Sequence, residues 1–354
     1  MNTLGKNFRL TTFGESHGPA MGGVIDGMPS GVKIDIDEVG RMIDRRRTGR
    51  SALTSQRREA DIPEILSGVN EGGLTLGTPI GFIFRNTDAR SADYSELEDH
   101  YRPNHADYTY DARYGLRDAR GGGRASARET VNWVMGGAIA MQWLKTLGVE
   151  ITARLTQVGA SGYSNPVELL GQDPVSGGIP FDESVEEAML REVEDAKNAL
   201  DSVGGRVTCV VKGIPAGLGA PVFGKLQARL AEAMMSLNAV KGFEYGIGAR
   251  AASKRGSEMI DRFNPGFTPL PFATNYAGGA LGGISTGMPV YFNLYFKPTP
   301  TIGRPLEMAR RDGGIDTVAA RGRHDPCVAM RAPVIVEALA AMTVADLMLD
   351  PRNP

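Results

Sequence analysis

One histidine of this sequence stands in an unusual setting. The stretch GESHGPAMGG (14–23) places His17 among glycines and small polar residues, in a chain with only 4 histidines in 354 residues. Imidazole gains or loses a proton near neutral pH, and a glycine-rich backbone lets a bound molecule approach closely. His17 is therefore a candidate for acid–base chemistry, and the rest of the sequence must indicate on what molecule it acts.

The arginines indicate an anionic ligand. The segment RRRTGRSALTSQRR (45–58) holds six arginines and no acidic residue. Further arginines lie beside the other histidines, in YRPNHADYTY (101–110) and ARGRHDPC (320–327), and in GGGRASARET (121–130). A guanidinium binds phosphate or carboxylate through two parallel hydrogen bonds, so these segments predict a site for a dianionic small molecule. A solvated basic face is one alternative. Nucleic-acid binding is another, but the nearby aromatic residues do not interleave with the arginines.

The overall composition gives no support to a nucleic-acid or membrane partner. Lys and Arg total 39 against 41 Asp and Glu, a net charge of −2. Cys209 and Cys327 are few and far apart, which is typical of a reducing compartment, and the histidines and cysteines lack the short spacings of a metal site. We expect no signal peptide, and no window that reaches the roughly 18 apolar residues of a membrane-spanning helix. We expect a cytoplasmic protein without a metal.

Other familiar chemistries fit poorly. No GxxxxGK[ST] motif occurs, and GIGARA (246–251) matches the dinucleotide pattern only loosely. Ser16 and His17 are adjacent, and adjacent residues of an extended segment point to opposite faces. We therefore expect no hydrogen bond between them of the kind that a serine hydrolase needs.

The elements that must position these residues are mixed. Apolar spacing predicts helices over 125–147, 184–200 and 333–349, and β-branched or aromatic runs predict strands over 74–84, 206–213 and 288–296. The 46 glycines are spread without a repeat and mark turns or close backbone approaches. No linker divides the chain, so one domain over 1–354 is expected, with 161–183 as a peripheral insertion.

Three long segments resemble the chorismate synthase family. They are FGESHGPAMGGVIDGMP (13–29), YRPNHADYTYDARYGLRDARGGGRASARETVNW (101–133) and GRHDPCVAMRAPVIVEA (322–338), supported by MSLNAVKGFEYGIG (235–248) and KPTPTIGRP (297–305). The resemblance covers essentially the whole chain. It implies an α+β fold, a β-α-β sandwich in a single large domain, assembled as a homotetramer.

The resemblance also implies a function. Such an enzyme converts 5-enolpyruvylshikimate 3-phosphate to chorismate and phosphate by an anti 1,4-elimination, the last step of the shikimate pathway to aromatic amino acids. It requires reduced FMN, which would lend an electron that helps the allylic phosphate to depart and recover it when the hydrogen is lost. NADPH is a possible reductant for the flavin.

The site residues are carried over from the family by position. His17 would protonate or hold the departing phosphate, His105 would keep the reduced flavin correctly protonated, and Asp325 would take a proton from the flavin. Residues expected to cradle FMN are Arg124, Ala125, Ser126, Asn238, Ala239, Gly282, Lys297, Pro298, Thr299, Pro300, Thr301 and Arg323. Residues expected to bind the substrate are Arg46, Arg50, Arg102 and Arg128.

Three positions depart from the family pattern. Relatives often have Arg at Ala52, Gly at Asn104 and Ser at Ala125. The change at Ala52 weakens the expected anion clamp unless Arg50 substitutes, whereas Asn at 104 tolerates left-handed backbone angles. A non-catalytic flavin- or anion-binding relative with a decayed substrate clamp is the alternative, and an RNA-binding protein is a third hypothesis.

Overall fold

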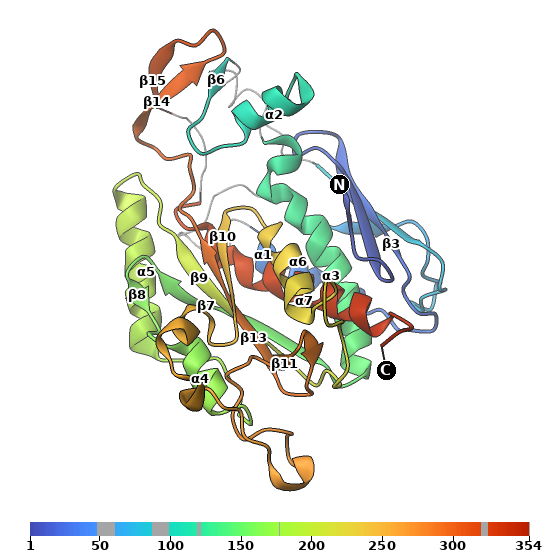
Figure 1. Ribbon diagram of the computed structural model, residues 1–354. Helices are drawn as coiled ribbons and strands as arrows, with labels where there is room; N and C mark the ends of the chain where they lie inside the picture. The colour runs from blue at the N-terminus through green and yellow to red at the C-terminus, as the bar shows by residue number, and fades with distance from the viewer. Residues whose placement is uncertain (48–60, 87–98, 119–121, 177, 320–324, 354) are drawn as a thin grey trace.

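Figure 1 shows the computed structural model of the chain, which describes residues 1–47, 61–86, 99–118, 122–176, 178–319 and 325–353. Helix α7 (Ala332–Met348) runs through the middle of the molecule, and its buried residues continue without a break from Val334 to Leu347. A helix with no polar face must be covered on every side. The fold is accordingly built in layers around α7.

The first layer is a five-stranded antiparallel sheet in the order β1-β2-β3-β5-β4. Alternate residues of its strands face inward, so Phe82 and Phe84 are buried and meet edge to face, with ring centroids 5.9 Å apart. The inner face packs on helix α3 (Thr130–Thr146). The strands are β1 (Thr3–Leu4), β2 (Arg9–Gly14), β3 (Ala20–Asp26), β4 (Pro63–Ile65) and β5 (Ile80–Arg85).

The second layer is another five-stranded antiparallel sheet, in the order β10-β13-β9-β7-β8. Strand β9 is buried at consecutive positions because both faces of the sheet are covered, by α7 on one side and by α4 (Pro166–Gln172) on the other. Helix α5 (Glu183–Asn198) packs near the β8 edge. The strands are β7 (Glu150–Val158), β8 (Ser161–Gly162), β9 (Gly205–Lys212), β10 (Val240–Tyr245) and β13 (Val290–Phe296).

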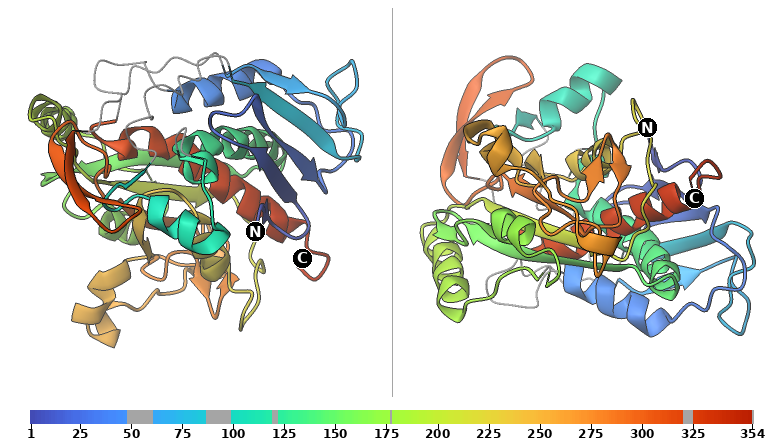
Figure 2. Two further views of the ribbon diagram at one scale, coloured as in Figure 1. Left: turned by 90° about the horizontal axis from the view of Figure 1, so that it is seen from above. Right: turned by 60° about the horizontal axis from the view of Figure 1, so that its bottom comes forward.

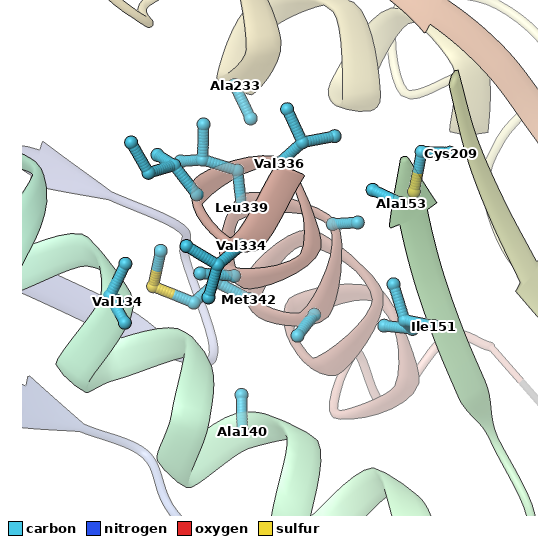
Figure 3. Close-up of a cluster of buried hydrophobic side chains, with 14 of the residues drawn as sticks. Val134, Ala140, Ile151, Ala153, Cys209, Ala233, Val334, Val336, Leu339 and Met342 are labelled. Carbon is cyan, nitrogen blue, oxygen red and sulfur yellow. The ribbon is translucent and has the colours of Figure 1, made fainter. Parts of the chain in front are cut away.

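The remaining helices fill the space between the sheets. Helix α1 (Ile36–Arg46) packs on α3 and α7, and helix α6 (Leu226–Met235) packs on α7 and β10. Figure 3 shows α7 surrounded by side chains of its neighbours, among them Val134 of α3, Ala233 of α6 and Ile151 of β7. Two sheets with helices between them are the β-α-β sandwich that the family resemblance implies, so the α+β prediction is confirmed.

A smaller lobe stands at one edge of the sandwich, and Figure 2 shows it from two further directions. It consists of helix α2 (Asp107–Tyr114) and a three-stranded sheet in the order β15-β14-β6. Its strands are β6 (His100–Tyr101), β14 (Pro305–Arg310) and β15 (Ile315–Ala319). The lobe therefore joins segments that lie about 200 residues apart in the chain.

Two buried carboxylates connect α7 to its surroundings. Glu337 accepts two hydrogen bonds from the Arg45 guanidinium, at 2.7 and 3.0 Å, and one from the backbone N–H of Ala153 at 3.0 Å. Asp346 accepts from the backbone N–H of Phe8 at 3.1 Å and from Arg229 at 2.9 Å. Buried charges are stable only when they are paired in this way. They fix α1, α6 and the N-terminal segment against α7.

The predicted elements are confirmed with shifts at their ends. The expected helices correspond to α3, α5 and α7, but the first begins at Thr130 because two short 3-10 turns, Gly123–Ala125 and Ala127–Glu129, precede it. The expected strand at 74–84 begins only at Ile80, since Gly77 has a φ of 75° and Pro79 lacks a backbone N–H. The segment 161–183 contains β8 and α4, and its status as an insertion stays a prediction.

One expectation about membrane spans is wrong. Among the described residues, Val328–Met348 is long and apolar enough to cross a bilayer, although no such window was expected. Its most apolar window is 78% buried inside the structure. The composition thus reflects the central position of α7 in the core.

The contact between α3 and α7 yields a stability prediction. A Cβ added to Gly137 of α3 would lie 2.3 Å from the Cα of Ala338 of α7, so the two helices would have to separate. We expect Gly137→Ala to lower the free energy of unfolding by about 1–3 kcal/mol, despite the better helix propensity of alanine. Urea unfolding followed by circular dichroism measures this change.

Gly40 of α1 provides the matched control. A Cβ at this position meets nothing within 4 Å. Gly40→Ala should therefore raise the free energy of unfolding by up to about 1 kcal/mol. If both variants were stabilised equally, close packing of α3 on α7 would not be the reason for Gly137.

Candidate active site

A buried group of two arginines and one aspartate lies at the end of α1, and we call Arg46, Asp61 and Arg128 the arginine cluster. Arg46 donates from Nη1 to Asp61 Oδ2 at 3.0 Å, and Arg128 donates from Nη1 to the other carboxylate oxygen. Arg46 Nε also donates to the Thr130 hydroxyl at 3.0 Å. The three charged side chains are 5%, 1% and 4% exposed, so the cluster holds two positive charges and one negative charge away from water.

The neighbouring arginines Arg45 and Arg46 have different tasks. Both lie in the last turn of α1, but Arg45 is bound to Glu337 of α7 whereas Arg46 enters the arginine cluster. Adjacent helical residues point about 100° apart, so the anchoring of Arg45 in the core directs Arg46 toward the cluster. Helix α1 is therefore oriented by one arginine and supplies the other to the site.

Asn86 connects the arginine cluster to the turn that carries His17. Its side-chain oxygen accepts from Arg128 Nη2 at 3.0 Å, and its amide nitrogen donates to the backbone oxygen of Gly18 at 2.8 Å. The Gly18 N–H in turn donates to the Glu15 oxygen at 3.0 Å, which closes a tight turn around His17. The turn that carries His17 follows β2, and Asn86 links it to Arg128 of the arginine cluster.

One expectation about this turn is wrong. Ser16 Oγ and His17 Nδ1 lie 3.0 Å apart and form a hydrogen bond, although we expected adjacent residues to face apart. The expectation assumed an extended segment, but the chain reverses here after β2. The buried Ser16 hydroxyl consequently orients the His17 ring.

Arg331 connects the arginine cluster to Asp325. Its guanidinium donates to the Asp325 carboxylate and, from Nη1, to the backbone oxygen of Arg46 at 3.4 Å. Arg331 stands directly before α7 and is buried, so Asp325 is held at the end of that helix. A continuous path of contacts therefore runs from Asp325 to the His17 turn.

A second charged group lies in the small lobe, and we call Arg102, His105, Asp107 and Arg117 the histidine cluster. Asp107 Oδ1 lies 2.8 Å from His105 Nδ1, accepts a hydrogen bond from Arg102 Nη2 at 2.8 Å and forms an ion pair with Arg117 Nη1 at 2.9 Å. Burial alone would raise the pKa of Asp107, but the hydrogen bonds and positive charges of Arg102 and His105 hold it well below its ordinary value. Asp107 is therefore ionised at neutral pH.

The segments expected to hold the flavin lie against one another and against the histidine cluster. The Asn238 amide donates to the Ala125 backbone oxygen at 2.7 Å, and the Lys297 backbone N–H donates to Ala239 at 2.9 Å. Lys297 Nζ donates to the backbone oxygen of Asn104 at 2.8 Å. Burial, and to a lesser extent the charge of Lys241, lowers the pKa of Lys297.

These segments fit a polar ligand such as FMN. Asn238 Oδ1 and Thr299 Oγ1 are buried without a hydrogen-bond partner among the described residues. Buried polar atoms without partners cost free energy, and these two oxygens are available to accept hydrogen bonds from a polar ligand. Ala239 has a φ of 67°, a strained angle for a residue with a side chain, and such strain concentrates at ligand sites.

A cavity of about 1030 Å³ adjoins the histidine cluster and Arg124, whereas Asn238, Ala239 and Lys297–Thr301 are not among its lining residues. His105 and Arg124 line it, together with Glu15, Glu129 and Trp133. Arg124 is held by Glu129 at 2.6 Å and by the Thr12 hydroxyl at 2.7 Å. The volume suffices for a cofactor-sized molecule.

Some predicted residues lie elsewhere or outside the described residues. Gly282 is in the hairpin of β11 (Ala280–Leu281) and β12 (Ile284–Ser285). This hairpin is hydrogen-bonded to the N-terminal end of α6, whereas Asn238 follows the C-terminal end of that helix. The two predicted flavin residues therefore lie at opposite ends of α6. Arg102 is engaged with Asp107, so its contact with substrate stays a prediction. Arg50, Ala52 and Arg323 lie outside the described residues. Asn104 has a φ of 57°, as expected for asparagine in place of glycine.

The sequence analysis missed four residues that hold the site together, namely Asp61, Asn86, Asp107 and Arg331. Asp107 carried a signal, because it stands two residues after His105 in RPNHADY. Asp61 follows the arginine-rich segment and Asn86 follows a strand, but nothing in their local sequence shows that the chain brings them together. Only the fold connects positions so far apart.

Comparisons with known proteins agree with this geometry. Residues 8–349 match the family model described as Chorismate synthase. The chain is 49% identical over 353 residues to chorismate synthase of Bacteroides fragilis, covering 98% of each chain, and 46% identical to that of Methanocella arvoryzae, covering 98% of this chain and 94% of the other. A solved crystal structure of chorismate synthase matches with a TM-score of 0.74 at 28% identity, over 98% of this chain and 92% of the other.

The arginine cluster yields a second prediction. Asp61 has a φ of 47°, which asparagine tolerates, so Asp61→Asn removes the charge with little backbone strain. Two buried guanidiniums would then lack their shared counter-charge, and we expect the free energy of unfolding to fall by about 3–5 kcal/mol. Chemical unfolding at pH 7 measures the change.

Asp44→Asn is its control, since the side chain of Asp44 is 56% exposed and lies 2.7 Å from Arg47. An exposed pair of this kind contributes about 0–1 kcal/mol. Equal effects of the two substitutions would show that Asp61 does not stabilise the cluster.

Proposed function

The chain belongs to the chorismate synthase family, and we propose that the arginine cluster, the histidine cluster and the flavin segments together form its active site. The reaction converts 5-enolpyruvylshikimate 3-phosphate to chorismate and phosphate, which makes the protein a carbon–oxygen lyase with a small-molecule substrate. The observation that carries the assignment of residues is the path of contacts from Asp325 through Arg331, the arginine cluster and Asn86 to the His17 turn.

FMN would be held by the segments around Ala125, Asn238 and Lys297–Thr301. Asn238 Oδ1 and Thr299 Oγ1 offer polar atoms for the hydroxyls of its side chain, and Lys297 offers a charge for its phosphate. When bound in the reduced form, FMN supplies a transient electron that helps an unactivated allylic phosphate to leave. Family members require reduced flavin, and we propose that NADPH is one possible reductant.

Arg46 and Arg128 would bind the anionic substrate. The substrate carries a phosphate and two carboxylates, and each guanidinium can donate two parallel hydrogen bonds to such a group. Asp61 holds both guanidiniums in fixed positions before the substrate arrives, so little side-chain freedom is lost on binding. Arg50 would add a further positive charge from a segment outside the described residues.

His17 and Asp325 would handle the protons at this site. Ser16 holds His17 Nδ1, so the other ring nitrogen is the one that would donate to the departing phosphate. Arg331 holds the Asp325 carboxylate in place as a proton acceptor. His105 would exchange a proton with the bound cofactor from the cavity side.

The retained proton-transfer groups and their contacts support the enzyme over a non-catalytic relative with a decayed clamp. We also propose, from the family resemblance, a cytoplasmic homotetramer. The position of Gly282, away from the other flavin residues of its own chain, is compatible with a site that neighbouring subunits help to build.

The requirement for reduced flavin is the direct test of this function. We expect chorismate and phosphate to form under anaerobic conditions with chemically reduced FMN, and no product with oxidised FMN, because only the reduced ring has an electron to lend. Absorbance of chorismate and release of phosphate measure the two products. Undiminished turnover with oxidised FMN, or with none, would exclude the assignment.

Asp325→Asn tests the proton acceptor. The amide keeps the shape of the side chain but cannot take a proton, so we expect turnover to fall by at least ~10²-fold while FMN and substrate bind nearly normally. Single-turnover rates and flavin titration on the same preparation separate chemistry from binding. Asp316→Asn is the control, because this exposed carboxylate pairs with His100 in the lobe. Near-wild-type turnover of Asp325→Asn would remove it from the mechanism.

A further inference from the structure

We propose that Asp107 is a positioning residue that keeps the proton of His105 on Nδ1, so that Nε2 is the nitrogen that exchanges protons with the bound molecule. The inference rests on the role proposed for His105 and adds a residue to which no role has been assigned. It concerns the free protein, and its test does not require bound flavin.

The geometry around His105 Nδ1 allows two assignments of the proton. The nitrogen lies 2.8 Å from Asp107 Oδ1, which can only accept, and 3.0 Å from Arg102 Nη2, which can only donate. A proton on Nδ1 makes a hydrogen bond to the carboxylate. A bare Nδ1 would accept from Arg102 but would place two lone pairs against each other at 2.8 Å, which is repulsive.

The ionised state of Asp107 decides between these assignments. The carboxylate accepts from Arg102 Nε at 2.8 Å and from the Arg102 backbone N–H at 3.1 Å, and it forms an ion pair with Arg117 Nη1 at 2.9 Å. The hydrogen bonds and positive charges of Arg102 and His105 hold the pKa of Asp107 well below its ordinary value despite its burial. Arg102 Nη2 also reaches Oδ1 directly at 2.8 Å, so it does not need Nδ1 as an acceptor.

The other charged groups around the cluster leave this arrangement intact. Arg117 also faces Asp111 at 4.0 Å, and Arg311 pairs with Asp111 at 3.0 Å, so the second carboxylate of α2 is engaged away from His105. From the main body, Lys297 reaches the backbone oxygen of Asn104 and not the imidazole. Among the described residues, Asp107 is the one carboxylate in direct contact with the ring.

The consequence is a defined acceptor on the cavity side. In the Nδ1–H form the opposite nitrogen, Nε2, keeps its lone pair, and His105 lines the 1030 Å³ cavity. The ring can then take a proton at Nε2 and return it without rotating. Loss of this control would leave the ring in the Nε2–H form that free histidine favours, which can donate but cannot accept at that position.

Nitrogen NMR on the full-length protein without flavin tests the inference. With ¹⁵N-labelled histidine, the ring nitrogen shifts distinguish the two neutral forms, and only 4 histidines must be assigned. His105→Gln identifies the relevant signal by its loss. We expect the Nδ1–H form in the wild-type protein at pH values where the ring is neutral. Detection of the Nε2–H form in the wild type would overturn the inference without any further variant.

Two substitutions that each remove one negative charge complete the test. Asp107→Asn should convert His105 to the Nε2–H form or a mixture and lower kcat by about 10-fold or more, with KM changed far less. Asp111→Asn removes a carboxylate from the same helix without touching the ring, so the Nδ1–H form should persist. An unchanged Nδ1–H form in Asp107→Asn, with a native circular dichroism spectrum, would contradict the inference. If the wild type showed the Nδ1–H form but no flavin-dependent turnover, the proposed function would be excluded and the inference about Asp107 would stand.

Discussion

The burial of α7 is the constraint on which the rest of the structure depends. An apolar helix must be covered on all sides, and neither sheet can do this alone. Helix α3 approaches it closely through Gly137, the second sheet covers the opposite flank, and α1 and α6 close the gaps. The site lies where this packing ends, because Arg331 and Asp325 directly precede α7 and Arg46 is at the end of α1.

The same arrangement of charges recurs at three places in the structure. At each place a buried carboxylate accepts hydrogen bonds or ion pairs from several neighbouring side chains, and it holds those side chains in fixed positions. Asp61 joins Arg46 to Arg128, Asp107 joins Arg102 and Arg117 to His105, and Glu337 fixes α1 through Arg45. A lone buried charge would be unstable, whereas these groups balance charge and fix direction together. Preorganisation of this kind suits a reaction in which several anionic groups must be aligned.

The sequence predicted what local patterns encode. Apolar spacing located α3, α5 and α7, and the motifs around His17 and His105 supplied the residues to which we propose proton-transfer roles. The contact between Ser16 and His17 was predicted wrongly, because a turn closed by Gly18 is invisible to a rule for extended chains. Asp61, Asn86 and Arg331 could not be assigned, since their roles arise only when distant elements meet.

The position of α7 in chain order also affects how the protein is made. It follows every other helix and strand of the described chain, yet it is the surface on which α1, α3, α6 and the second sheet pack. During synthesis the ribosome must therefore release almost the whole chain before these elements can bury their apolar faces. Until then the two sheets expose edges and hydrophobic side chains, a state prone to aggregation. Placing the core helix last thus leaves the apolar faces of α3 and the second sheet without their partner until α7 emerges.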